Sequence, residues 1–74
     1  MGKRQIRYLP TVLLARAAEI LGREADVVMR NGVVWHGVVD AISATALTLT
    51  DLRQLRREVA VGEVAEVLTD SASN

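Results

Sequence analysis

The stretch that decides the fold is Asn31-Gly32-Val33-Val34-Trp35-His36-Gly37. Asn-Gly is the strongest short signal for a β-hairpin, because a type I′ turn needs positive φ at both of its central residues. We therefore expect a two-residue turn in which Gly32 has positive φ. Gly37 has no side chain, so a strand is able to bend sharply at this position.

Apolar residues alternate with polar ones on both sides of this turn, as they do in strands that bury one face. We expect five short strands, over residues 26–30, 33–42, 46–50, 56–61 and 64–68. A turn over residues 51–55 separates the third strand from the fourth. Trp35 shares a face with Val33 and Val39, so we expect it to pack in a core or an interface.

The segment before the strands has a helical pattern. Apolar residues between Leu9 and Leu21 recur at spacings of three and four, which predicts a helix over residues 10–21. Pro10 suits the first turn of a helix, and Gly22 suits the position just past its end.

Composition limits how this chain is stabilised. It has 74 residues, no cysteine and one histidine, so disulfides and a structural zinc site are excluded. Because a small domain leaves much of its surface exposed and half of the residues are hydrophobic, assembly with further copies is the support that remains. No apolar run approaches the ~20 residues of a membrane span, and the interrupted N-terminal segment is unlike a signal peptide. We expect a cytoplasmic protein without cofactors.

The order of these elements and the spacing from Asn31-Gly32 to Gly37 resemble the Sm-like protein superfamily, which includes LSm and Hfq-like proteins. The resemblance covers roughly residues 10–68. It implies an N-terminal α-helix followed by a strongly bent five-stranded antiparallel sheet, a small Sm-like or SH3-like barrel. We expect a basic N-terminal lead over residues 1–8, the Sm-like domain over 9–70 and a disordered tail over 71–74.

The chain departs from the family at its nucleotide-binding positions. Ser43-Ala44-Thr45-Ala46 stands where the family has an acidic residue followed by an amide or aromatic side chain. Ala60-Val61-Gly62 shares only the glycine with the second family signature. The resemblance therefore implies the fold and ring assembly more firmly than RNA binding in the ring's pore.

Two basic clusters are the candidate RNA-binding sites. The hairpin cluster consists of Arg53, Arg56 and Arg57. The N-terminal cluster consists of Lys3, Arg4 and Arg7 together with Tyr8, whose ring could stack on a base, although an anchoring contact is the interpretation that we favour for it. Arginine and lysine side chains on a loop suit phosphate contacts, although a solvated hairpin tip has the same composition. Lysine plus arginine equals aspartate plus glutamate at nine each, which argues against broad electrostatic capture of nucleic acid but permits local patches.

Ring assembly follows from strand edges. The strands over residues 56–61 and 64–68 are short and rich in valine, and a bent sheet that does not close leaves unpaired edges. Two different edges pair head to tail and close a ring, which by the family resemblance has roughly five to seven subunits. The valines expected at this interface are Val59, Val61, Val64 and Val67.

No catalytic motif appears in the sequence, and we expect the protein not to be an enzyme. His36 and Asp40 have same-face spacing in one strand, but no nucleophile accompanies them. An exposed strand pair is the interpretation that we favour for them. The leading hypothesis is an Sm-like ring that binds single-stranded RNA on one face. The alternatives are a structural or protein-interaction ring and an unrelated SH3-like barrel that mediates protein contacts.

Overall fold

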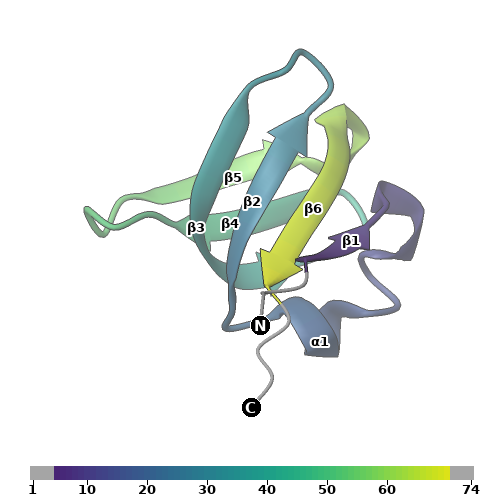
Figure 1. Cartoon of the computed structure of the whole chain (residues 1–74), viewed down its shortest axis with the longest axis horizontal. Helices are drawn as coiled ribbons and strands as arrows, with labels where there is room; N and C mark the ends of the chain where they lie inside the picture. Colours follow the sequence, from purple (N-terminus) through teal and green to yellow (C-terminus); the bar gives the residue numbers. More distant parts are fainter. Residues whose placement is uncertain (1–4, 71–74) are drawn as a thin grey trace.

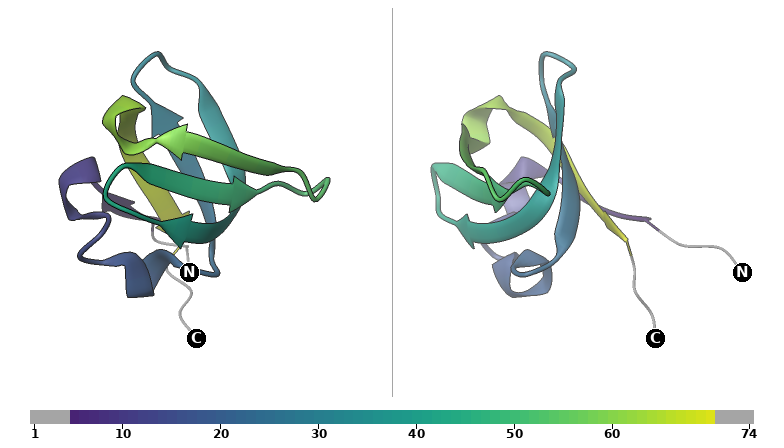
Figure 2. Two further views of the ribbon diagram at one scale, coloured as in Figure 1. Left: turned by 180° about the vertical axis from the view of Figure 1, so that it is seen from behind. Right: turned by 90° about the vertical axis from the view of Figure 1, so that its left-hand side faces the viewer.

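The computed structural model describes residues 5–70, and this part of the chain is mainly β. Six antiparallel strands form one open sheet in the order β1-β6-β2-β3-β4-β5. Their bounds are β1 (Gln5–Tyr8), β2 (Glu24–Met29), β3 (Val34–Ile42), β4 (Ala46–Thr50), β5 (Arg56–Ala60) and β6 (Val64–Asp70). The sheet curls so that β4 and β5 lie behind β2 and β6 (Figures 1 and 2). The mainly β fold is confirmed, but the expected number of strands is wrong.

The extra strand is β1, within the segment that we expected to be a basic lead. Gln5 pairs with Asp70 and Tyr8 pairs with Val67, so β1 covers one side of β6. The other side of β6 pairs with β2. The expectation that residues 64–68 form a sheet edge is therefore wrong, because the edges of the sheet are β1 and β5. The tail expected over residues 71–74 lies outside the described residues.

The helix expected over residues 10–21 is also wrong. Its place is taken by a 3₁₀ turn, η1 (Pro10–Val12), and one turn of α-helix, α1 (Ala17–Ile20). Neither has a side-chain cap on its N-terminus. A helix this short is marginally stable unless one whole face packs against the protein. In this segment only some of the apolar positions are buried. Leu13 and Ile20 are buried, whereas Leu9 and Leu21, which belong to the same predicted apolar stripe, are exposed.

The interior is built from the inward faces of all six strands and the segment before β2. Its buried apolar residues are Tyr8, Leu13, Ile20, Ala25, Val27, Val39, Leu47, Leu49, Val59, Val64 and Val67. Three of the valines expected at a subunit interface, Val59, Val64 and Val67, thus belong to the chain's own core. Val61, in the 3₁₀ turn η2 (Val61–Glu63), is partly buried against that core. Their side chains are already engaged within one copy.

The β2–β3 hairpin turns through three residues, not the two that we expected. The amide of Gly32 donates to the carbonyl of Met29 at 2.9 Å, and the amide of Met29 donates to the carbonyl of Val33 at 2.8 Å. This is the pattern of a three-residue loop that ends in a left-handed residue. Gly32 has φ +93°, so the expected positive φ is confirmed.

Gly37 marks the sharp bend of β3. The first half of the strand pairs with β2 up to Val38, and the second half pairs with β4 from Val38 onward. A Cβ on Gly37 would lie 2.5 Å from the carbonyl oxygen of Thr50. Only glycine permits this close approach of two backbones, so the bend depends on its missing side chain.

Gly32 provides a test of the turn that is independent of packing. A Cβ on Gly32 or on Gly62 would meet no atom within 4 Å, but only Gly32 has positive φ. We expect Gly32→Ala to lower the free energy of unfolding by about 1 kcal/mol, the lower end of the cost of a Cβ in the left-handed region. Urea unfolding followed by circular dichroism measures the change. Gly62→Ala is the matched control and should have a smaller effect; equal losses in both variants would contradict the turn.

Candidate nucleic-acid interface

The β4–β5 hairpin projects from the body of the protein (Figure 1, at the left). Every residue from Leu52 to Glu58 is exposed. Leu52 and Leu55 at its tip are 80% and 56% exposed, so two apolar side chains lie open to solvent beside the arginines. The three arginines of the predicted hairpin cluster, Arg53, Arg56 and Arg57, lie on the same hairpin.

Asp51 holds the loop of this hairpin in shape. Its Oδ1 accepts the amide of Arg53 at 2.8 Å and the amide of Leu55 at 3.0 Å. The amide of Gln54 donates to the carbonyl of Asp51, and Gln54 has φ 68°. The loop therefore has the same three-residue form as the β2–β3 turn, with glutamine in the position that glycine takes there. The turn expected over residues 51–55 is confirmed.

The arginines of the hairpin form no ion pair with the described residues. The ion pairs found within residues 5–70 are Arg7–Glu66, Arg16–Glu19 and His36–Asp26. Since a guanidinium offers several N–H donors in a planar fork, Arg53, Arg56 and Arg57 are available to bind phosphate or carboxylate groups from outside the chain.

Trp35 on β3 and Arg57 on β5 are in direct contact. The guanidinium carbon of Arg57 lies 3.6 Å from the centroid of the Trp35 ring, which is a stacked cation–π contact. Trp35 is partly buried and packs against the core, so the core packing that we expected for it is confirmed. Its partner could not be recognised in the sequence, because 22 positions separate the two residues and the contact depends on the bend of the sheet.

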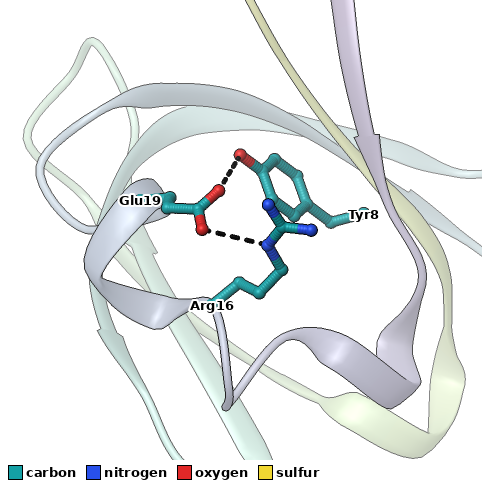
Figure 3. Close-up of polar contacts among 3 residues, drawn as sticks. All are labelled: Tyr8, Arg16 and Glu19. Atoms are coloured by element: carbon teal, nitrogen blue, oxygen red, sulfur yellow. Dashed lines mark hydrogen bonds and ion pairs between the residues drawn. The ribbon is translucent and has the colours of Figure 1, made fainter.

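Tyr8 does not lie on the surface as an RNA-binding residue would. It is 3% exposed, and its hydroxyl donates to Oε1 of Glu19 at 3.2 Å (Figure 3). Arg16 donates to Oε2 of the same carboxylate at 3.0 Å. Burial raises the pKa of Tyr8, and Glu19 adds to this rise, while the hydrogen bond from Arg16 lowers the pKa of Glu19. The three residues anchor the N-terminal segment to the sheet, and the Tyr8 ring is not free to stack on a base.

The predicted N-terminal basic cluster is only partly described. Arg7 forms an ion pair with Glu66 on β6. Lys3 and Arg4 lie outside the described residues. β1 and the projecting β4–β5 hairpin lie on opposite sides of the molecule (Figure 1), so Arg7 and the hairpin arginines belong to separate parts of the surface.

His36 pairs with Asp26 across β2 and β3, not with Asp40 along its own strand as we expected. Its Nδ1 lies 2.5 Å from Oδ1 of Asp26, which stands directly opposite in the register. Asp40 instead accepts a hydrogen bond from the hydroxyl of Thr50. The difference arises because residues facing each other on neighbouring strands are closer than residues at i and i+4 in one strand.

The surface around His36 carries the acidic residues Glu24, Asp26 and Asp70. A hollow of about 340 Å³ beside the hairpin is lined in part by Glu24, Asp40 and Asp51. Even so, no three histidine, cysteine, aspartate or glutamate side chains of the described part converge as a metal site requires. No helix among residues 5–70 is long and apolar enough to cross a membrane.

Comparison with known proteins identifies no relative of this chain. No protein-family model matches the sequence, and neither a curated protein nor a solved structure gives a significant match. Function is therefore inferred from the arrangement of the chain's own residues.

The His36–Asp26 pair predicts a pH effect of defined sign. The hydrogen bond that His36 donates to Asp26 is the main cause of a raised pKa at His36, and the charges of Asp26, Glu24 and Asp70 add to it. Since the folded-state pKa is raised, the stabilisation is complete below about pH 6.5, the ordinary histidine value, and disappears as pH rises through the folded-state pKa. The effect is small because 48% of the His36 side chain is exposed.

We expect Asp26→Asn to lower the pKa of His36, measured by an NMR titration of the only histidine. Asp40→Asn is the matched control, because Asp40 shares the strand of His36 but bonds to Thr50. A larger drop in the His36 pKa in the Asp40 variant would restore the pairing that the sequence suggested.

Proposed function

We propose that this chain binds single-stranded RNA through the β4–β5 hairpin. The observation that carries the proposal is the presence of Arg53, Arg56 and Arg57, exposed and without ion-pair partners among residues 5–70, on one projecting hairpin. Phosphate contacts supply most of the affinity of proteins that bind RNA without strong sequence preference. A net charge of zero does not oppose this, since three of the chain's arginines lie within residues 51–58 against the two acids Asp51 and Glu58, which leaves the hairpin locally basic.

The Sm-like character of the subunit is part of this proposal. It is supported by the Asn31-Gly32 to Gly37 spacing and by five strands, β2 to β6, that bend around one core. Two features depart from what the resemblance implies: β1 is added to the sheet, and only short helical turns precede β2. The hairpin arginines are also distinct from the family's nucleotide-binding positions in this sequence.

We further propose head-to-tail assembly through the two sheet edges. The free edges, β1 and β5, differ in sequence, and neither contains proline or lysine, which commonly block edge pairing. Pairing of β5 in one copy with β1 in the next is heterologous, so a fixed rotation closes a ring. This replaces the β5-to-β6 contact expected from sequence, because β6 already has a neighbour on each side.

A protein-interaction ring is the second candidate, and the exposed leucines favour it. Leu52 and Leu55 at the hairpin tip supply apolar area that phosphate binding does not require. RNA binding is distinguished from protein binding by its salt dependence, because displacement of counterions from phosphates weakens RNA binding steeply as salt rises.

The RNA proposal predicts which arginines set that salt dependence. We expect the double variant Arg53→Gln and Arg56→Gln to bind a short oligouridylate more weakly than the wild type. The slope of log affinity against log salt should become shallower by about 0.7 for each phosphate that the variant no longer neutralises. Fluorescence anisotropy at several salt concentrations measures both quantities.

The charge-matched control for this variant is Arg23→Gln with Arg30→Gln, which removes two exposed arginines elsewhere. If both double variants showed the same decrease in affinity and in slope, the binding would be general and not localised to the hairpin. If the wild type failed to bind the RNA even at low salt, the protein-interaction ring would be favoured.

The assembly proposal predicts that one amide on β5 is essential. The Val61 amide donates to the Thr45 carbonyl at 2.9 Å. Because donors alternate along an antiparallel strand, the Glu58 amide points away from β4 to the free edge. We expect Glu58→Pro to keep the fold, since proline is tolerated on edge strands, and to lower the oligomeric mass measured by light scattering. Glu58→Ala keeps the amide and should assemble normally. A monomeric wild type at tens of micromolar would contradict assembly.

A further inference from the structure

Among the three hairpin arginines, only Arg57 has a cation–π contact with a described aromatic ring. Its guanidinium stacks on the Trp35 ring at 3.6 Å, and this is one of only two cation–π contacts among residues 5–70. The two residues come from β5 and β3, with β4 between them. On β4, Arg57 faces the buried Leu49, so its side chain begins on the core side of the sheet.

Arg57 remains exposed although its guanidinium stacks on Trp35, whereas Trp35 is partly buried against the core. We infer from this exposure that the guanidinium face turned away from the ring is accessible. A planar ligand is therefore blocked from the face of Trp35 that Arg57 covers. It is not blocked from the outer face of the guanidinium, whose N–H groups also remain available at its rim.

We propose that the outer face of Arg57 is a stacking site for an unpaired nucleobase, so that the hairpin selects single-stranded RNA over duplex RNA. This rests on the proposed RNA-binding function and specifies its ligand. Arginine planes stack on splayed bases of single strands, whereas the bases of a duplex are already stacked on one another. Trp35 holds the guanidinium flat before RNA arrives, and such preorganisation reduces the conformational entropy that binding removes.

Replacing Arg57 with lysine distinguishes stacking from a simple charge contact, because lysine keeps the positive charge but has no planar group. We expect Arg57→Lys to reduce the affinity for a short oligouridylate by about tenfold, which corresponds to the loss of one stacked base. Affinity for an abasic strand with the same number of phosphates should not change. Arg30→Lys is the matched control, because Arg30 is exposed and lies outside the hairpin, and it should bind both strands as well as the wild type. Thermal melting checks that each variant is folded.

Trp35 gives a second and direct readout, because it is the only tryptophan in the chain. We expect its fluorescence to change when the wild type is titrated with oligouridylate, and to change much less with the abasic strand or with duplex RNA. Trp35→Phe should keep most of the affinity, since a ring still supports Arg57, whereas Trp35→Leu should weaken binding as much as Arg57→Lys does.

The outcomes distinguish this inference from the function on which it rests. If the wild type binds oligouridylate and Arg57→Lys binds it equally well, stacking on Arg57 is refuted while RNA binding through the hairpin stands. Equal affinity of the wild type for the oligouridylate and the abasic strand refutes it in the same way. If the wild type binds no RNA at low salt, both the stacking site and the RNA-binding function are wrong.

Discussion

The rest of the structure depends on the close approach of β3 and β4 at Gly37. A side chain there would bring its Cβ to 2.5 Å from the Thr50 carbonyl oxygen, so the two backbones come this near only because the residue is glycine. The bend lets one strand pair with β2 along its first half and with β4 along its second. It thereby carries β4 and β5 across the inner face of β2 and β6 and encloses the core. It also brings Arg57 over Trp35, so the most distinctive feature of the candidate site is a product of the same bend.

The strands could be predicted because their alternation is local. Residues 46–50 and 34–42 carry a period-two pattern that needs no knowledge of the rest of the chain, and the observed bounds of β3 and β4 agree with it to within one residue. β1 could not be predicted in this way, because it is four residues long and only Tyr8 is buried. It is a strand because the edge of β6 pairs with it. The helix prediction failed for a related reason. The spacing along residues 9–21 predicts one apolar face, but the core buries Leu13 and Ile20 and leaves Leu9 and Leu21 at the two ends of that face exposed.

The sequence predicts which residues belong to the candidate site but not how they contact one another. Three arginines within five positions are visible in the sequence, and so is the turn that presents them. A tyrosine near a basic segment suits both a base-stacking surface and an anchor; the burial of Tyr8 and its bond to Glu19 agree with the anchoring contact that we favoured and not with the RNA-binding role. His36 was paired with the wrong aspartate, because cross-strand neighbours depend on register. The Trp35–Arg57 stack joins strands that are not adjacent in the sheet, so no pattern along the chain predicts it.

The equal numbers of acidic and basic residues conceal a surface whose charges are separated in space. At physiological salt, charges more than about 8 Å apart on a surface are largely screened from each other, whereas the described part of the protein is 34 Å along its longest axis. A ligand at the hairpin tip therefore responds mainly to the charges of the hairpin itself, which are the three arginines together with Asp51 and Glu58, and hardly to Glu66 or Asp70 on β6. Asp51 already accepts two amides through Oδ1, so its carboxylate is engaged by the backbone of the loop. Net charge, which sums over the whole chain, is therefore a poor guide to what this hairpin binds.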